Sequence, residues 1–289
     1  NQDFSNVLGK LSDFTARTGD VMKARAYNRA RDTIQSIGDD IKSVEQLKNT
    51  PTIGATIYDR LEEYTKTGKV ALLEQYQNDP LILFTNVYGI GPKKAEELVK
   101  QHHIRSIEEL REKQDLVLNN IQRIGLKYYE DILERIPRNE IAKYDCELMK
   151  TFKKVSENSP TYYEVVGSYR RGATNSGDID IIITSDDHSV FHRVLDELIS
   201  KKMIIEVLSR GDTKCLVVAK LTPRSKARRV DFMFTTRKEY PFAILYFTGS
   251  KDFNTAMRAH ALRMGMSMNE HGFTNKLNQQ KIVYNDVVM

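Results

Sequence analysis

One short segment restricts the fold more than any other: VGSYRRGATNSGDIDIIIT, Val166–Thr184. Small residues and two arginines lead into two aspartates separated by one isoleucine, and an apolar run follows at once. Along a β-strand successive side chains point to opposite faces. Asp178 and Asp180 therefore share one face, while Ile179 points into a core. The segment predicts a buried strand that presents two carboxylates beside a positively charged loop.

A third acid is available in RRVDFMF, Arg228–Phe234. Its alternating apolar residues form one face of a predicted strand and leave Asp231 on the other. Carboxylates held side by side repel unless a cation lies between them, and such an oxygen site suits Mg²⁺, which also shares phosphate oxygens. Taken alone, the D-x-D pair also fits turn aspartates before a buried strand, with Asp231 merely solvated.

The loop before the acids favours the metal interpretation. Gly167-Ser168 follows a strand, and small residues let backbone N–H groups approach a phosphate closely. Arg170 and Arg171 can meet phosphate oxygens bidentately, and Ser176-Gly177 offers a second close approach. A phosphate-binding loop beside metal carboxylates indicates a nucleotide whose triphosphate bridges the two, so opposite charges address one ligand from two sides.

The pattern of apolar residues changes from helical to strand-like near Arg135–Arg138. The first half has the three- and four-residue apolar spacing of short helices, predicted at Phe4–Thr15, Asp20–Ser36, Thr56–Thr67 and Lys93–Gln101. The second half predicts an α+β unit with a mixed or antiparallel sheet. Its strands are expected at Tyr163–Val166, Ile179–Thr184, Ile204–Leu208, Lys214–Leu221 and Arg229–Phe234, and its helices at Asn139–Ser156, Ser189–Lys201 and around Tyr240–Met264, before a short polar segment.

Composition is compatible with a polyanion-binding protein. The 289 residues exceed a typical single domain. The net charge is +5, and basic residues cluster at Lys23–Arg31 and Lys220–Arg229. There is no apolar run of membrane-spanning length, no secretory signal pattern and no disulfide framework. We expect a protein without a membrane segment. Because the first residue is Asn, we also expect the sequence to begin inside a longer gene product.

The motifs GSYRRG, SGDIDIII, RRVDF, YFTGS and MRAHAL resemble the polymerase beta branch of the family X DNA polymerases, from about Leu8 to Asn269. The resemblance implies an all-α amino-terminal half with two helix-hairpin-helix motifs, an α+β nucleotidyltransferase palm and a short carboxy-terminal subdomain. The implied domains are a 5′-phosphate or lyase-like domain at 1–75, a DNA-binding fingers or thumb subdomain at 76–137, the palm at 138–237, and a short or truncated nucleotide-selecting subdomain at 238–289.

The resemblance also implies the roles of the acids and of the residues around them. Asp178 and Asp180 would hold two Mg²⁺ ions, which Mn²⁺ can replace, and Asp231 would hold the catalytic ion and help to activate the primer 3′-hydroxyl. The implied triphosphate positions are Arg135, Gly167, Ser168, Arg171, Ser176 and Gly177. The implied sugar, base and minor-groove positions are Tyr246, Phe247, Gly249, Lys251, Asn254 and Arg258. Arg229 would contact DNA, and Glu270 would act when the enzyme closes. Without the resemblance, Tyr246 and Phe247 read as core aromatics before a turn.

Two glycine turns, each followed by a helix, resemble helix-hairpin-helix motifs that grip a backbone phosphate. The implied DNA contacts are Gly54, Gly89, Gly91 and Lys93. A Na⁺ or K⁺ ion is implied among backbone carbonyls of Thr85, Val87 and Ile90, and of Lys48, Thr50 and Ile53 in the first copy. The alternative is an ordinary helix–turn–helix corner, and the first copy lacks one glycine.

The sequence departs from the family pattern at several positions. Arg60 stands where the family has its Schiff-base lysine, and a guanidinium is always protonated and cannot be the nucleophile. Lys23 and Tyr27 remain, so we predict a 5′-phosphate pocket of Lys23, Tyr27 and Arg60 with weak or no lyase activity. Three further departures touch the polymerase site: Lys251 for an acid, Met233 for an arginine that pairs with the metal carboxylates, and His271 for a tyrosine.

The leading functional prediction is a template-directed, gap-filling DNA polymerase of base excision or end repair. It would act as a monomer on gapped or nicked double-stranded DNA with dNTPs. The alternatives are a template-independent nucleotidyltransferase and a non-catalytic DNA-end scaffold. The resemblance implies an intracellular, nuclear protein, with a cytoplasmic or viral setting left open, and no protein partner is indicated.

Overall fold

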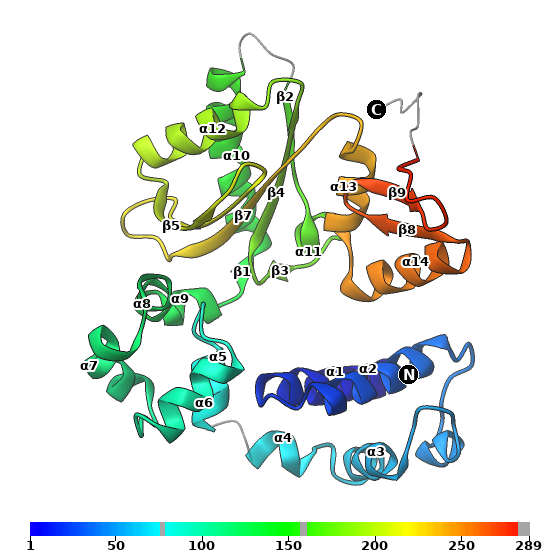
Figure 1. Ribbon diagram of the computed structural model, residues 1–289. Coiled ribbons are helices and arrows are strands. Elements are labelled where there is room, and N and C mark those ends of the chain that lie inside the picture. Colours follow the sequence, from blue (N-terminus) through cyan, green and yellow to red (C-terminus); the bar gives the residue numbers. More distant parts are fainter. Residues whose placement is uncertain (76–78, 157–160, 283–289) are drawn as a thin grey trace. The chain divides into compact units, whose positions relative to one another are not determined.

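The computed structural model describes residues 1–75, 79–156 and 161–282 and divides into two compact units, Asn1–Tyr129 and Glu130–Met289 (Figure 1). The domain boundary expected near residue 76 falls among residues outside this description. The first unit contains two helical groups with separate cores, and the second contains the sheet.

The first helical group begins with two long helices packed on each other, α1 (Gln2–Arg17) and α2 (Val21–Ser36). Asp20 caps α2 by accepting the amide of Lys23 at 3.0 Å, which explains where that helix begins. A 3₁₀ turn η1 (Val44–Leu47), α3 (Ala55–Thr67) and α4 (Ala71–Gln75) complete the group. The three helices predicted here are confirmed to within about two residues at each end.

The second helical group consists of α5 (Pro80–Thr85), α6 (Pro92–Lys100), α7 (Ile107–Val117) and α8 (Asn120–Lys127). The next helix, α9 (Tyr129–Leu133), begins at the last residue of this unit and continues into the second. Pro80 and Pro92 stand at the first positions of α5 and α6, where a missing N–H costs nothing. Fully buried Phe84, Leu98 and Leu110 anchor its core. The sequence predicted α6 but not α5, α7 or α8.

The second unit is built on a five-stranded sheet in the order β2-β4-β7-β6-β5. Its strands are β2 (Thr161–Val165), β4 (Ile179–Ser185), β5 (Ile204–Arg210), β6 (Lys214–Ala219) and β7 (Arg228–Thr235). Only the central β4–β7 pair is parallel, so the sheet is mixed, as expected. Two short strands, β1 (Ile136–Pro137) and β3 (Asn175–Ser176), pair with each other in a separate two-stranded sheet.

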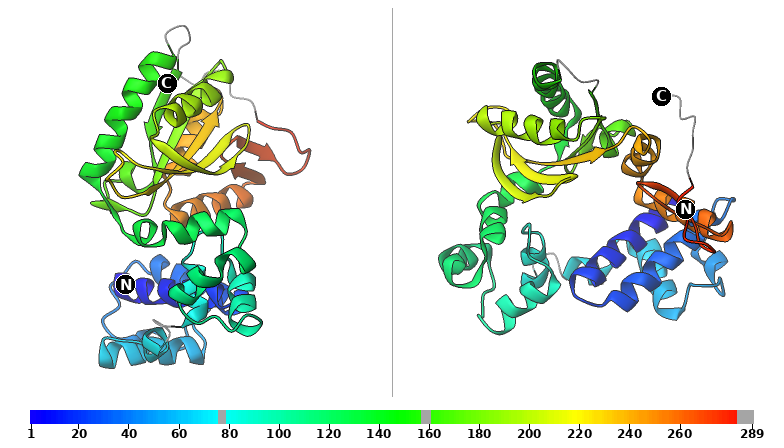
Figure 2. Two further views of the ribbon diagram at one scale, coloured as in Figure 1. Left: turned by 90° about the vertical axis from the view of Figure 1, so that its left-hand side faces the viewer. Right: turned by 45° about the horizontal axis from the view of Figure 1, so that its top comes forward.

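Alternation along β4 decides which face is core. Ile181 and Ile183 are fully buried with helices α10 (Arg138–Val155) and α12 (Ser189–Ser200), which cover one face of the sheet (Figure 2). Ile182 points to the other face and packs with Ala243 of α13 (Tyr240–Thr248). Asp180 is two residues before Ile182 and therefore lies on the α13 side.

The helical region predicted around Tyr240–Met264 is confirmed, and it is divided in two. Two helices occupy that region, α13 and α14 (Lys251–Arg263), because Gly249 adopts φ +60° and ψ −158°, which no helix contains. Ser250 then caps α14 by accepting the amide of Phe253 at 3.3 Å. The polar segment expected after α14 includes a hairpin of β8 (Met266–Asn269) and β9 (Gly272–Asn275).

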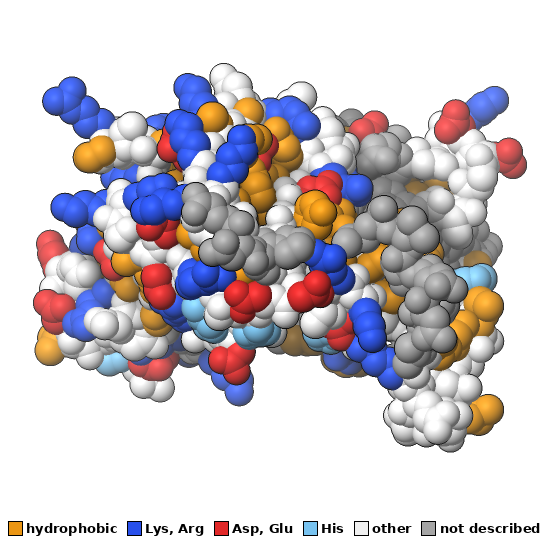
Figure 3. All heavy atoms as spheres, turned by 90° about the horizontal axis from the view of Figure 1, so that it is seen from above, with side chains coloured by type: hydrophobic (Ala, Val, Ile, Leu, Met, Phe, Trp, Pro, Cys, Tyr) orange, Lys and Arg blue, Asp and Glu red, His pale blue; other side chains and the backbone are white. Residues whose placement is uncertain are grey.

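Not every basic residue of the cluster at Lys220–Arg229 is available to a polyanion. Arg228 is 2% exposed and forms a bidentate pair with Glu140, with Nε–Oε1 at 2.7 Å and Nη2–Oε2 at 2.8 Å. Breaking a buried pair of this kind costs about 3–5 kcal/mol. On the face shown in Figure 3, basic and acidic side chains are mixed and do not separate by sign.

Candidate active site

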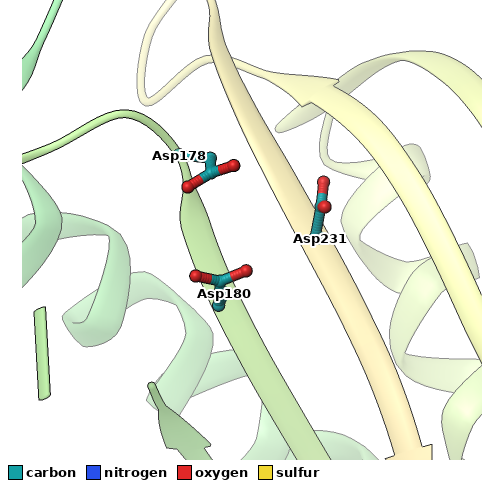
Figure 4. Close-up of side chains that lie close together, drawn as sticks. All are labelled: Asp178, Asp180 and Asp231. Atoms are coloured by element: carbon teal, nitrogen blue, oxygen red, sulfur yellow. The ribbon is translucent and has the colours of Figure 1, made fainter. Parts of the chain in front are cut away.

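Two neighbouring parallel strands bring the three predicted acids together (Figure 4). Asp180 on β4 is the register partner of Asp231 on β7, and Asp178 immediately precedes β4 on the same side. Each of the three acids offers an oxygen within 4.8 Å of an oxygen from each of the others. The strand alternation read from the sequence therefore predicted the convergence correctly.

Asp180 lies directly over Gly167, the first residue of the one-turn helix α11 (Gly167–Arg170). Gly167 adopts φ +61°, a left-handed conformation that favours glycine. A Cβ added there would lie 2.0 Å from Oδ2 of Asp180. Glycine is therefore needed at this position to seat the carboxylate, in addition to any approach of a phosphate to the loop.

The acids sit in a poorly solvated position. Burial, reinforced by the charges of Asp178 and Asp231, raises the pKa of Asp180 to about 7. Burial also raises the pKa of Asp231, although the nearby Arg229 guanidinium opposes the shift. Arg229 donates from Nη2 to Asp178 Oδ2 at 3.0 Å and to Asp231 Oδ2 at 3.3 Å. This arginine, implied as a DNA contact, thus lies between two of the acids.

The acid triad is consistent with divalent metal binding. Oδ1 of Asp231 is buried and accepts no hydrogen bond from the described residues, so its lone pairs are not used by the protein there. A partly desolvated set of carboxylate oxygens on rigid strands is the donor set that Mg²⁺ takes. An ion there would also offset the mutual repulsion that raises the pKa of Asp180.

A cleft of about 1060 Å³, open to solvent, adjoins two of the acids. It gathers residues of α11, α13 and α14, and its lining is Gly167, Ser168, Arg171, Asp178, Asp180, Tyr246, Phe247, Gly249, Ser250, Lys251, Asn254, Thr255 and Arg258. Most positions implied for the nucleotide therefore converge on one cleft. Ser250 and Thr255 were not singled out from the sequence, because their access depends on where α14 begins.

Three implied triphosphate positions lie beside this lining. Ser176 accepts the hydroxyl of Ser168 at 2.7 Å. Arg135 donates from Nε to Asn175 Oδ1 at 2.8 Å and from Nη2 to the Asn175 carbonyl at 2.9 Å. A Cβ added at Gly177 would lie 3.1 Å from Nη1 of Arg135, so this glycine leaves room for the guanidinium.

Both loop arginines contact Thr248, but only Arg171 lines the cleft. Arg171 lines the cleft and donates from Nη1 to the Thr248 carbonyl at 2.6 Å. Arg170 donates from Nε to Glu164 at 2.6 Å and does not line the cleft. Nearby, the rings of Tyr246 and Phe247 meet edge to face at 5.1 Å, and Asn254 Nδ2 holds the Tyr246 carbonyl at 2.7 Å.

Glu270 is placed away from the cleft acids. It lines a separate cavity of about 650 Å³ together with Met233 and His271. Tyr246 and Phe247 line both cavities and so form a shared wall. Met233, which stands where the family pattern has an arginine, packs against Ile182 and its apolar neighbours.

The two glycine turns of the first unit have the same backbone geometry. Ile53 donates its amide to the Thr50 carbonyl at 3.0 Å, and Ile90 donates to the Val87 carbonyl at 3.0 Å. Gly54 and Gly91 are the N-caps of α3 and α6. Where the second copy has Gly89 at φ +85°, the first has Thr52 at φ +74°, so the missing glycine does not change the turn.

The second turn is also held from behind by α8, which the sequence did not indicate. Gln122 donates from Nε2 to the Gly89 carbonyl at 3.0 Å. A Cβ added at Gly125 would lie 2.2 Å from the Tyr88 carbonyl oxygen. Lys93 lies on the exposed first turn of α6.

The residues implied for a 5′-phosphate line one cavity of about 880 Å³ in the first unit: Lys23, Tyr27 and Arg60. Arg60 donates from Nη1 to Glu63 at 2.9 Å, and Lys23 Nζ lies 3.2 Å from Asp20 Oδ2. Tyr27 is buried, and burial raises the pKa of its hydroxyl.

Comparison with known families covers most of the chain. A helix-hairpin-helix domain profile matches residues 1–70, a profile for the fingers domain of DNA polymerase lambda matches 82–133, a DNA polymerase beta palm profile matches 135–237, and a DNA polymerase beta thumb profile matches 243–286. The chain belongs to the family X DNA polymerases. Its acid triad lies in the palm segment.

Curated relatives agree with this assignment. DNA polymerase lambda from Arabidopsis thaliana is 29% identical over 94% of this chain and 54% of its own length. DNA polymerase lambda from Rattus norvegicus is 31% identical over 89% of this chain and 46% of its own. The type-X family DNA polymerase of Schizosaccharomyces pombe is 30% identical over 95% and 56%.

This family X chain thus spans about half the length of these relatives. Within residues 1–75, 79–156 and 161–282, no helix is both long and apolar enough to cross a bilayer.

Proposed function

We propose that this chain is a template-directed, gap-filling DNA polymerase that transfers a nucleotide from a dNTP to a primer 3′-hydroxyl in DNA repair. The observation that carries the proposal is the acid triad Asp178, Asp180 and Asp231 beside a cleft lined by most of the implied nucleotide positions. Family membership supports the same reaction class, and a nuclear setting follows from that analogy.

In this proposal each group of residues in and around the cleft contacts a different part of the nucleotide. The three acids hold two Mg²⁺ or Mn²⁺ ions, which when bound would neutralise phosphate charge and favour the primer alkoxide. Arg171 and the α11 amides bind triphosphate oxygens, with Arg135 and Ser176-Gly177 beside them. The Tyr246 and Phe247 wall faces the sugar. Asn254 and Arg258 read the minor-groove edge, Lys251 lies near the base, and Glu270 acts on closing.

The hairpin turns supply grip without reading sequence. In each turn, small residues and a helix N-terminus expose amides that suit one backbone phosphate. Two such turns suit the two sides of a short gap, with Gly54 in one turn and Gly89, Gly91 and Lys93 in the other. The carbonyls at Lys48, Thr50 and Ile53, and at Thr85, Val87 and Ile90, are the proposed sites for Na⁺ or K⁺.

Primer extension tests the polymerase proposal. The substrate is a duplex with a one-nucleotide gap and a 5′-phosphate, compared with the same primer as a single strand. We expect incorporation of the templated nucleotide on the gapped duplex, abolished by chelation and in Asp231→Asn but retained in Asp212→Asn, an exposed acid of the β5–β6 loop. Equal extension of the single strand would support template-independent transfer, and inactivity of the wild-type chain with Mg²⁺ would leave only a DNA-binding role.

We also propose that the first-unit cavity binds a 5′-phosphate but has lost most lyase activity. Arg60 fills the nucleophile position and is held by Glu63. Borohydride trapping on an incised abasic duplex should give little or no adduct with the wild-type chain. Arg60→Lys should restore a covalent adduct, because it returns a neutralisable amine to the cavity. A strong wild-type adduct would overturn the proposal.

A further inference from the structure

A fourth carboxylate, outside the metal triad, joins two walls of the cleft. Glu164 lies on β2 opposite Ile182 of β4 and therefore faces α13. Its Oε1 accepts Nε of Arg170 at 2.6 Å, and its Oε2 accepts the hydroxyl of Tyr240 at 2.8 Å. One carboxylate thus binds the end of α11 and the beginning of α13.

Arg170 and Tyr240 lie on the two helices, α11 and α13, that line opposite parts of the cleft. Arg170 closes α11, whose Gly167 and Ser168 line the phosphate end, and Tyr240 opens α13, whose last turn carries the Tyr246–Phe247 wall.

The far end of α13 is tied to the same turn. Arg170 Nη1 donates to Thr248 Oγ1 at 3.2 Å, and Arg171 Nη1 donates to the Thr248 carbonyl at 2.6 Å. Helix α13 is therefore fixed to α11 at both of its ends.

The ion pair alone would contribute little. The side chains of Glu164 and Arg170 are 36% and 43% exposed, and pairs at such sites are weak. Glu164 matters because one carboxylate serves two elements. Each of its oxygens accepts a charge-assisted hydrogen bond, one from α11 and the other from α13. Removing the charge would weaken both contacts at once and leave the Thr248 contacts to hold α13 against α11.

We propose that Glu164 is a positioning residue that sets the separation between the phosphate end and the sugar wall, and thereby strengthens discrimination against ribonucleotides. The inference rests on the proposed polymerase function. A nucleotide spans both ends of the cleft, so its triphosphate fixes the sugar relative to α11. Discrimination then requires that α13 not recede to admit a 2′-hydroxyl.

The test compares gap filling with dNTP and rNTP by Glu164→Gln, Tyr240→Phe and the double variant. For Glu164→Gln we expect KM for dNTP to rise about tenfold and the dNTP/rNTP ratio of kcat/KM to fall about tenfold, the size of one charge-assisted hydrogen bond. The kcat at saturating dNTP should change less than about twofold, because the acids are untouched. Glu147→Gln, which removes an exposed pair with Lys150 on α10, is the matched control.

Tyr240→Phe should also raise the KM for dNTP and lower the dNTP/rNTP ratio of kcat/KM, each by a smaller factor. The double variant should show the same KM and the same ratio as Glu164→Gln. An unchanged nucleotide ratio in an active, folded Glu164→Gln protein overturns the inference. If that variant fails to fold, Tyr240→Phe, which deletes one oxygen, decides alone. If the wild-type chain extends no primer, the polymerase proposal fails separately. Titration with fluorescent dATP and ATP analogues in Ca²⁺ then decides whether Glu164 sets sugar preference.

Discussion

At the scale of single residues, the position of Asp180 in the acid triad depends on the glycine beneath it, Gly167. Gly167 combines a left-handed backbone with a contact that leaves no room for a methyl group under Asp180. Sequence reasoning assigned this glycine to phosphate approach. It could not see the second requirement, because Asp180 reaches Gly167 only when β4 and α11 meet.

Gly167→Ala should therefore lose nucleotidyl transfer by about a hundredfold, the effect of displacing a catalytic group by roughly 1 Å. Single-turnover incorporation on gapped DNA measures it. Gly172→Ala is the matched control, because Gly172 is also left-handed, at φ +84°, but nothing lies within 4 Å of an added Cβ. Equal losses in both variants would show that backbone strain, and not displacement of Asp180, is responsible.

The raised pKa of Asp180 predicts a pH-dependent stability in chelator. Its folded-state pKa of about 7 lies above the unfolded value of about 3.9. The carboxyl therefore favours folding fully below the unfolded pKa, and that contribution is lost as pH rises to about 7. Asp180→Asn should remove this loss and raise the Tm of the metal-free protein at pH 8 by on the order of 3 °C.

Added Mg²⁺ should reverse the order, stabilising the wild-type protein more than Asp180→Asn, because binding to the folded state favours folding. Differential scanning fluorimetry from pH 5 to pH 8, with and without Mg²⁺, records both effects. Asp212→Asn should follow the wild type throughout. A metal-free Asp180→Asn protein that melts below the wild type at pH 8 would contradict the prediction.

At the scale of elements, sequence periodicity located structure where the core is regular. The ends of β4 and β7 were predicted to within about one residue. In β7 apolar and polar residues alternate, and in β4 a continuous apolar run is buried on both faces of the sheet. The helices α4, α5, α8 and α9 were not predicted, since five to eight residues contain too few turns to show a helical period, and the 11-residue α7 was missed as well. The turn expected after Phe247 is present at Gly249, where α13 ends before α14 begins.

The candidate site shows the same division. The acids, the loop and the hairpin glycines are contiguous motifs, so a single sequence contains their signal. The contacts that orient them are not contiguous. Glu164 reaches Tyr240, Arg229 bridges Asp178 and Asp231, and Gly125 meets Tyr88 only through the fold.

Replacing a helical glycine by alanine should change the free energy of unfolding in opposite directions at Gly9 and at Gly125. Gly9→Ala in α1 should stabilise the protein by about 0.5–1 kcal/mol, because alanine is the better helix former and the nearest atoms to an added Cβ belong to the flexible Arg31 side chain at 3.7 Å or more. Gly125→Ala in α8 should instead destabilise it by about 1–3 kcal/mol, because its methyl would overlap the Tyr88 carbonyl.

Urea unfolding followed by circular dichroism compares the two variants. Gly125→Ala should also weaken binding to gapped DNA, since Tyr88 belongs to the second hairpin turn, whereas Gly9→Ala should not. Stabilisation by both substitutions would show that α8 does not support the turn in solution.

At the scale of the whole molecule, the proposed chemistry and the proposed grip reside in different units. The acids lie within Glu130–Met289, and both hairpin turns lie within Asn1–Tyr129. Each unit has its own buried cores. A substitution at the acids should therefore change the rate of incorporation and leave the Kd for DNA intact. A substitution at a hairpin turn should do the reverse.

The last prediction separates the two quantities in the full chain. Asp231→Asn should abolish incorporation while leaving the Kd for gapped DNA within about twofold, because no hairpin contact changes. Lys93→Glu should raise that Kd and reduce the slope of log Kd against log salt concentration by about one, as loss of one phosphate contact requires. Once DNA is saturating, Lys93→Glu should retain the wild-type rate of incorporation. Because Lys113 lies on α7 rather than at a hairpin turn, Lys113→Glu serves as the charge-matched control. If Lys113→Glu weakens binding as much as Lys93→Glu, general electrostatic attraction, and not the hairpin turn, holds the DNA.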